Sequence, residues 1–215
     1  MVDGNDAFTT TRRGAIKTGA LGLGGLTGAI ALGSSESATA ATLPTMDTVA
    51  ALAGVTSGAF FLQLDGIPGD SVDAGHPGWI PVNDWSTGAT NSAVLTSSGW
   101  SSSKPRIETV SLTAQGGSQS PRLFLSTVSG RRSARALLQG VTRGDSPRTY
   151  LEVELRDVAV ASYDVKAGED GSIVDDFALA YGSIRFSIYL QSATGGAGET
   201  ISATWNVRTG TGSST

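Results

Sequence analysis

The chain has a single histidine, His76, and it lies close in sequence to residues that could join it in nucleophilic catalysis. A catalytic triad needs a nucleophilic hydroxyl, a general base and an orienting carboxylate that converge in space. Ser71 and Asp73 are near His76, but serines are so abundant here that this proximity proves little. Pro77 follows His76 in a glycine-flanked loop, and no GxSxG or HExxH signature occurs. We therefore interpret His76 as a structural turn residue and expect no enzymatic activity.

Acidic clusters raise the question of a metal site. Carboxylate oxygens are the ligands that Ca²⁺ prefers, but neither acidic cluster has the D-x-D-x-D-G spacing of a calcium loop. With no cysteine and one histidine, the chain also falls short of the usual zinc ligand set and can form no disulfide. We expect solvated loops, and neither a metal nor a cofactor. The two clusters are Asp65, Asp70 and Asp73, and Glu169, Asp170, Asp175 and Asp176.

The charge balance gives no reason to expect a nucleic-acid partner. The net charge is −4, and it stays −4 without the first 40 residues, which hold three basic and three acidic residues. A mildly acidic domain lacks the electrostatic footprint of nucleic-acid binding. We interpret the one basic cluster, Arg131, Arg132 and Arg135, as a solvated loop.

The first 40 residues have the layout of a bacterial Tat export signal. Paired arginines in "TRRGAIK" precede a weakly apolar, glycine-rich run, and Ala38-Thr39-Ala40 supplies a small-residue cleavage pattern. The apolar run is too short and too rich in glycine to span about 30 Å of hydrocarbon. We predict cleavage after Ala40, export through the Tat pathway, and no stable membrane insertion afterwards.

Period-two alternation of apolar and polar residues dominates the rest of the chain and predicts half-buried antiparallel strands. The clearest examples are residues 60–64, which end at the turn signal Asp65-Gly66, 184–190 and 201–207. In residues 149–160 the apolar phase changes, which predicts a β-bulge near Arg156 and Asp157. Strands at such intervals favour an antiparallel barrel or sandwich.

Helical signals are few. Residues 120–130 predict a short helix in which Ser120 caps, Pro121 takes the first position and Gly130 the left-handed end. Leu123, Phe124 and Val128 would then lie on one face. Residues 45–55 predict another short helix, and the tail 209–215 is expected to be disordered.

Two tryptophans follow the first long loop. In "WIPVNDW", Ile80 and Val82 share one face, so Trp79 and Trp85 are expected on the opposite, outer face. Pro81 cannot donate a ladder hydrogen bond there, so this strand is an edge strand or a bulged one. Exposed indoles can stack on sugar rings in a carbohydrate-binding module, or can anchor a neighbouring protomer.

The segment from Phe61 to Ser86, F-L-x-L-D-G-I-x-G-D-S-x-D-x-G-H-x-G-W-I-x-V-x-x-W-S, resembles the N-terminal signature of the Hcp family. This is the family of haemolysin-coregulated tube proteins of type VI secretion. Three later pieces are similar in order and spacing: Ser120 to Gly130, Tyr150 to Ser162 and Phe177 to Tyr189. The resemblance implies an all-β Hcp-like barrel over residues 60–208 with one short flanking helix, preceded by an N-terminal extension, residues 41–59.

The resemblance also implies that protomers form hexameric rings, which stack as a tube around a wide lumen that could hold a small protein cargo. With an export signal, we expect a secreted protein that acts outside the contractile machine. The residues expected at the contact between protomers are Trp79, Trp85, Asp65, Gly66 and His76. The alternative remains a secreted carbohydrate-binding β-sandwich.

Overall fold

The computed structural model describes residues 58–168, 170–192 and 196–215. The predicted export signal and the helix predicted over residues 45–55 lie outside the described residues. The described chain contains one helix, α2 (Ser120–Ser129). Its strands are β1 (Gly58–Leu64), β2 (Ile80–Ser86), β3 (Ala89–Thr90), β4 (Ala93–Thr96), β5 (Gly99–Ser102), β6 (Arg106–Ile107), β7 (Val110–Gln115), β8 (Arg132–Thr142), β9 (Thr149–Ala167), β10 (Ile173–Gln191), β11 (Ala197–Asn206) and β12 (Thr211–Ser214).

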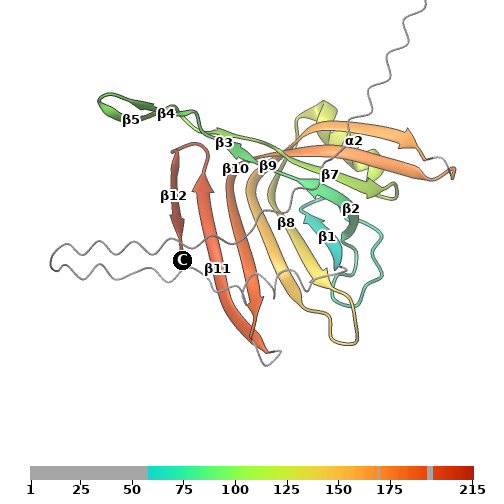
Figure 1. The fold of residues 1–215 in the computed structure, drawn as a ribbon. Helices are drawn as coiled ribbons and strands as arrows, with labels where there is room; N and C mark the ends of the chain where they lie inside the picture. The colour runs from blue at the N-terminus through green and yellow to red at the C-terminus, as the bar shows by residue number, and fades with distance from the viewer. Residues whose placement is uncertain (1–57, 169, 193–195) are drawn as a thin grey trace, which may run out of the picture. The chain divides into compact units, whose positions relative to one another are not determined.

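Antiparallel pairing closes six of these strands into a barrel. The large sheet has the order β12-β11-β10-β7-β2-β1-β8-β9, and a further pairing of β10 with β9 completes the circle. Figure 1 shows the long strands β8, β9 and β10 curving side by side, with α2 beside the upper end of β9. The expected all-β antiparallel barrel with a short flanking helix is thus confirmed.

β10 is the strand from which the sheet leaves the barrel. Its first half, Val174 to Leu179, pairs with β7, and its second half, Ser183 to Gln191, pairs with β11 on the same edge. β9 lines the other edge along nearly the whole length. As a result β11 and β12 extend the sheet beyond the closed part of the barrel.

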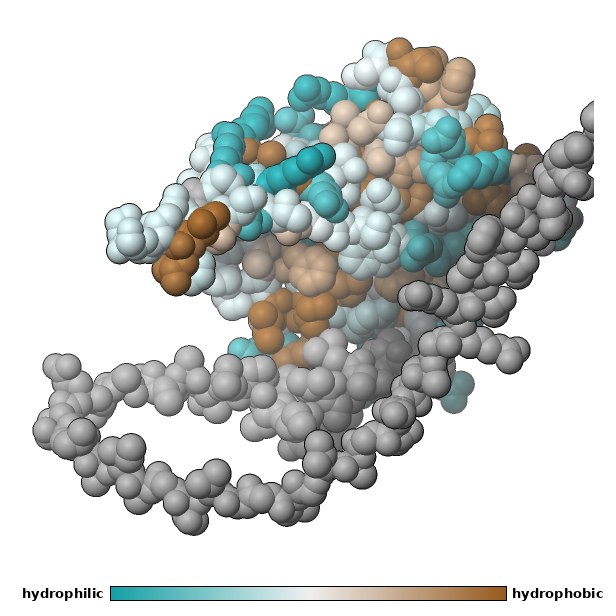
Figure 2. Space-filling model, turned by 45° about the horizontal axis from the view of Figure 1, so that its top comes forward, coloured by the Kyte–Doolittle hydropathy of each residue, from teal (hydrophilic) through white to brown (hydrophobic). Residues whose placement is uncertain are grey.

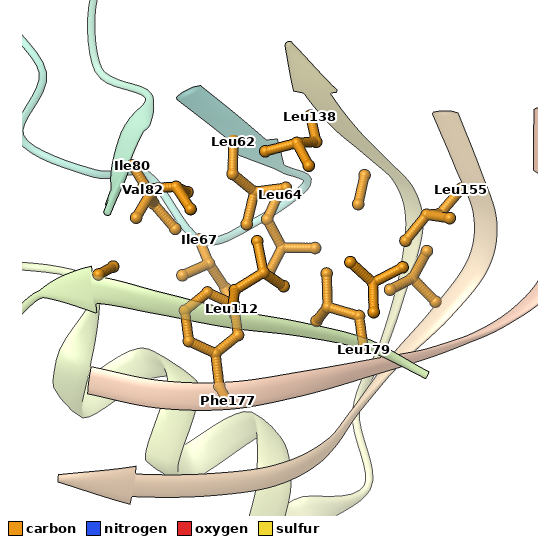
Figure 3. Close-up of a cluster of buried hydrophobic side chains, with 14 of the residues drawn as sticks. Leu62, Leu64, Ile67, Ile80, Val82, Leu112, Leu138, Leu155, Phe177 and Leu179 are labelled. Atoms are coloured by element: carbon orange, nitrogen blue, oxygen red, sulfur yellow. The ribbon is translucent and has the colours of Figure 1, made fainter. Parts of the chain in front are cut away.

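The core consists of the inward residues of these alternating strands. Leu62 and Leu64 on β1 are almost completely buried, as are Leu138 on β8 and Leu155 on β9. Figure 3 shows these side chains converging with Phe177 and Leu179 of β10. Each such aliphatic side chain contributes roughly 1.5–3 kcal/mol by leaving water.

The change of apolar phase in β9 is present, but its cause differs from the predicted bulge. The register of β9 with β10 continues unbroken past Asp157, and the register shift falls between Ala178 and Leu179 of β10. Asp157 instead has a left-handed backbone with φ of 55°. A Cβ on Gly182 would lie 3.1 Å from the Asp157 side chain, so a larger residue at position 182 would crowd Asp157.

The helix α2 ends as predicted but begins differently. Gly130 has a φ of 63° and terminates the helix in the left-handed region. The N-cap position is Gln119 and makes no capping hydrogen bond through its side chain, so the predicted Ser120 cap is wrong. The Ser120 hydroxyl is occupied elsewhere, because it donates to Asp175 Oδ2 at 2.7 Å.

Asp175 also determines which face of α2 is buried. Leu123 is fully buried, whereas Phe124 and Val128 are 56% and 64% exposed. The expected single apolar face is therefore wrong. The bond from Ser120 to Asp175 fixes the rotation of the helix, so that Leu123 and Ser126 face the barrel.

The C-terminal tail is ordered from Thr211, against the expected disorder. The Asn206 side chain builds the turn, since its Oδ1 accepts from the backbone N–H groups of Arg208 at 3.0 Å and Thr209 at 3.1 Å. Gly210, with a φ of 67°, completes the reversal. β12 then pairs with β11, which gives the tail backbone partners that composition alone did not predict.

Candidate interface around the first long loop

The loop between β1 and β2 is organised around His76, which is only 7% exposed. The His76 ring stacks on Phe61 with centroids 4.4 Å apart and planes 5° apart. The Trp79 ring meets it edge-on at 4.9 Å. These three rings fix the loop against the start of β2 and the end of β1.

Both ring nitrogens of His76 have polar partners. Nδ1 lies 2.8 Å from Asp73 Oδ1, and Nε2 lies 3.0 Å from Gln139 Oε1 on β8. Both nitrogens can donate at once only in the imidazolium form. The hydrogen bond from His76 is the first cause that lowers the pKa of Asp73.

These contacts do not form a catalytic triad. The position next to Nε2 holds the Gln139 amide, where a triad needs a nucleophilic hydroxyl. Ser71 Oγ accepts from the Asp73 backbone N–H at 3.2 Å and so serves the turn. The geometry supports the interpretation of His76 as a structural turn residue.

The two tryptophans do not share an outer face. The register of β2 with β7 shifts between Val82 and Asp84, so β2 is bulged, which is one of the two possibilities that Pro81 indicated. The other possibility, an edge strand, is wrong because β2 pairs with both β1 and β7. The shift turns Trp85 toward the core side, where its ring meets Phe60 edge-on at 6.1 Å. The expectation of a common outer face is therefore wrong, and the flat two-ring platform of a sugar-binding module is not formed.

Asp65 and Gly66 form the turn that closes β1. Gly66 has a φ of 81°, which favours glycine, and the Ile67 N–H donates to Leu64 O at 2.9 Å. Asp65 is anchored through its backbone, since Ser133 Oγ donates to Asp65 O at 2.7 Å. The structure thus brings Asp65 and Gly66 to the start of β8, while Trp79 and His76 lie across the loop.

The acidic clusters do not converge on a metal. Among residues 58–168, 170–192 and 196–215, no group of three or more acids and histidines could hold an ion. Glu169 lies outside the described residues. Asp70 Oδ2 accepts from the Ser118 N–H at 2.7 Å, which ties the loop to the start of α2. Hydrogen bonding to Ser118, first through its side chain and then through its backbone, lowers the pKa of Asp70. Asp175 is fully buried, so it cannot belong to a solvated loop.

An exposed apolar arm, residues 87–109, was missed by sequence reasoning. β3 pairs with β6 at its base and β4 with β5 at its tip, and neither pair joins the large sheet. Val94, Leu95 and Trp100 at the tip are 58%, 65% and 75% exposed. Figure 1 shows the arm extending from the barrel, and Figure 2 shows apolar surface at its end. Residues 97–103 consist of serines around Gly99 and Trp100 and have no apolar–polar alternation that would indicate a hairpin.

Among the described residues, the structure contains no candidate membrane-spanning helix.

Taken together, a closed antiparallel barrel, one flanking helix and a long arm between β2 and β7 define an all-β class of closed-barrel proteins. The family model "Type VI secretion system effector, Hcp" matches residues 61–188, which is more than half of the chain. The chain belongs to the Hcp family, a family of secreted structural proteins.

Solved structures agree with the fold. A structure described as a type six secretion system protein has a TM-score of 0.67 and 23% identity, and the match covers 73% of this chain and 100% of the other. Hcp1 from Salmonella typhimurium has a TM-score of 0.59 and 21% identity, and the match covers 73% of this chain and 99% of the other. A type VI secretion system effector from Yersinia pestis has a TM-score of 0.56 and 21% identity, and the match covers 69% of this chain and 99% of the other. No match was found among curated protein sequences.

Proposed function

We propose that this chain is an exported structural protein whose copies join head to tail into hexameric rings. Membership of the Hcp family supports this, since the resemblance implies ring assembly. The rings would stack into a tube outside the cell, and their lumen could carry a small protein cargo. The twin-arginine segment at Arg12 and Arg13 would direct export through the Tat pathway.

The observation that carries the proposal is the apolar arm. A two-stranded hairpin on its own is at best marginally stable in water. The tip nevertheless exposes Val94, Leu95 and Trp100 together, and tryptophan is the residue type most enriched at the energetic centres of interfaces. The tip and the flank of the barrel are different surfaces, so an arm docked on a second copy makes a head-to-tail contact, which closes into a ring when the rotation allows.

The flank after the first loop supplies the proposed receiving surface. Trp79 is half-buried against His76, so part of its indole remains available to a neighbouring copy. Asp65 and Gly66 border the same loop and are exposed. In this proposal Trp85 supports the flank from the core side, where it packs against Phe60.

Light scattering coupled to size-exclusion chromatography tests the proposal at micromolar concentration. The wild-type chain should elute with about six times the monomer mass, and the Leu95→Ser, Trp100→Ser double variant should fall toward the monomer with an unchanged circular dichroism spectrum. Val165→Ser is the matched control, because Val165 on β9 is an exposed apolar residue (58%) outside both the arm and the first long loop. A wild-type monomer would refute the ring, and a double variant of unchanged mass would refute the role of the arm.

A further inference from the structure

A cavity of about 510 Å³ lies where the β8–β9 and β10–β11 hairpins end. Figure 1 shows these ends of the long strands at the bottom of the sheet, away from α2. The walls of the cavity are mostly apolar and include the side chains of Tyr150, Tyr189 and Leu190. Pockets for small ligands have volumes of roughly 300–1,000 Å³ and mostly apolar walls with a few polar groups. The cavity therefore has the size and the lining of a small-molecule site.

Two irregularities of the sheet border this cavity. The register of β8 with β9 shifts between Gly140 and Val141, so Tyr150 has no partner residue on β8. The register of β10 with β11 shifts between Tyr189 and Gln191. Bulges re-aim side chains and are common at the rims of barrels and beside functional sites. Both aromatic walls of the cavity thus lie where the regular ladder is interrupted.

The position of Tyr150 is fixed by two glycines and a phenylalanine. A Cβ on Gly140 would lie 2.9 Å from Cζ of Tyr150, and a Cβ on Gly58 would lie 2.9 Å from the Tyr150 hydroxyl. The Phe60 ring meets the Tyr150 ring edge-on at 6.4 Å. A side chain that is already held in place loses little conformational entropy when a ligand binds. Tyr150 is therefore a preorganised part of the cavity wall.

The hydroxyl groups of both tyrosines can serve a ligand. Neither the Tyr150 nor the Tyr189 hydroxyl makes a hydrogen bond to another described residue. Burial is the first cause that raises the pKa of each tyrosine, so both phenols are protonated at neutral pH. A protonated phenol donates a hydrogen bond. The cavity thus offers two donors to the oxygen atoms of a ligand.

Arg148 supplies the charge of the cavity. Among the described residues that line it, Arg148 is the one charged residue, and none is acidic. Thr142 anchors the Arg148 backbone, because the Arg148 N–H donates to Thr142 Oγ1 at 3.0 Å and the Thr142 N–H donates to Arg148 O at 2.9 Å. A guanidinium can bind a carboxylate through two parallel hydrogen bonds. The polar groups of the cavity therefore suit an anion.

We propose that this cavity binds a small alkyl carboxylate, whose chain lies against Tyr150, Tyr189 and Leu190 and whose carboxylate meets Arg148. A cavity of about 150 Å³ holds benzene, so about 510 Å³ has room for a chain of about eight carbons. An alkyl cation would meet the positive charge of Arg148. A sugar would place its hydroxyl groups against the apolar walls, which costs free energy. The proposal goes beyond ring assembly and holds for a single chain as well as for a ring.

Isothermal titration calorimetry of the full chain at pH 7 compares octanoate with octylamine, which has the same chain length and the opposite charge. Octanoate should bind at one site per chain and at least tenfold more tightly than octylamine. Hexanoate should bind about tenfold more weakly than octanoate, because two buried methylene groups are lost. If octanoate fails to bind a folded chain at either of two temperatures, or if octylamine binds as tightly, the proposal is wrong.

Two variants test the polar groups. Tyr189→Phe keeps the ring and removes one donor, so octanoate should bind about tenfold more weakly, whereas octylamine should bind as it does to wild type. Arg148→Gln should remove the preference for octanoate over octylamine. A preference that survives in Arg148→Gln would show that the carboxylate does not meet Arg148 and would overturn the proposal.

A third variant tests the location of the site. Ala197 is exposed and lines the cavity, so Ala197→Trp fills the cavity without changing the core. This variant should keep the circular dichroism spectrum of wild type and lose octanoate binding. Ala161→Trp is the matched control, because Ala161 is exposed on β9 outside the cavity lining, and it should bind octanoate like wild type. Equal octanoate affinity of the two variants would place binding elsewhere and refute the assigned site.

Discussion

The residue that suggested chemistry, His76, is held by partners that suit a structural role. Its imidazole is stacked on Phe61 and meets a carboxylate on one side and an amide on the other. Gln139 also contacts β9, because its Nε2 donates a hydrogen bond to Glu152 Oε2 at 2.9 Å. This chain of hydrogen bonds links the loop to β8 and β9.

The contact between Asp73 and His76 predicts an acid-sensitive loop. The pKa of Asp73 is lowered from its ordinary value of 3.8, first by the hydrogen bond from His76. Because the folded pKa lies below the unfolded one, the stabilisation is present above pH 3.8 and is lost as the pH falls through the folded value. Urea unfolding from pH 6 to about pH 2 should show this loss in wild type and a weaker loss in Asp73→Asn.

The control for this measurement is Asp145→Asn, which changes an exposed carboxylate in the turn between β8 and β9. Its unfolding should have the same pH dependence as wild type. Identical profiles for Asp73→Asn and wild type would show that the Asp73 contact contributes nothing to folding.

At the level of elements, the attachment of α2 to the barrel depends on one buried acid. Asp175 accepts from Gln119 Nε2 at 3.1 Å, Ser120 Oγ at 2.7 Å and Tyr163 OH at 2.8 Å. A buried carboxylate is tolerated only when donors surround it. The same acid thus joins the start of the helix, β9 and β10.

Replacing Asp175 by Asn should loosen the helix and change the titration of Tyr163. Burial first, and then the bond to Asp175, raises the pKa of Tyr163 to about 12. In Asp175→Asn this pKa should move part of the way back toward 10, as followed by tyrosinate absorbance. The free energy of unfolding should fall by about 2 kcal/mol, since donors lose a charged acceptor.

The raised pKa of Tyr163 also predicts alkaline behaviour. The neutral phenol is favoured in the folded state, so its contribution is complete below the unfolded pKa of about 10 and is lost as the pH rises toward 12. Asp164→Asn, at an exposed carboxylate on β9, is the control and should alter neither the titration nor the stability. An unchanged Tyr163 titration in Asp175→Asn would contradict the assigned role of Asp175.

Sequence periodicity predicted the barrel because alternation reports burial directly. Periodicity failed where one extra residue changes the inward–outward alternation of a strand. The register shift in β2 after Val82 turns Trp85 inward, and nothing local in "PVND" distinguishes a bulge from a regular strand. The helix was predicted from Pro121 and Gly130, but its buried face depended on Asp175, 55 residues away from Ser120. Long-range polar contacts of this kind are not visible in a local pattern.

On the scale of the whole molecule, the described residues expose apolar side chains on two surfaces. The tip of the arm exposes Val94, Leu95 and Trp100, and β11 exposes Ile201. The arm extends from the barrel, which suits a contact with another copy. A net charge of −4 is small enough to permit association of copies.

The most direct measurement of the central claim is negative-stain electron microscopy of the wild-type chain at micromolar concentration. Head-to-tail assembly predicts annular particles with an open centre and sixfold averages, and these should disappear in the Leu95→Ser, Trp100→Ser variant. A field of small particles without a central hole, seen for a wild-type chain that is folded by circular dichroism, would contradict the assignment as a ring-forming protein.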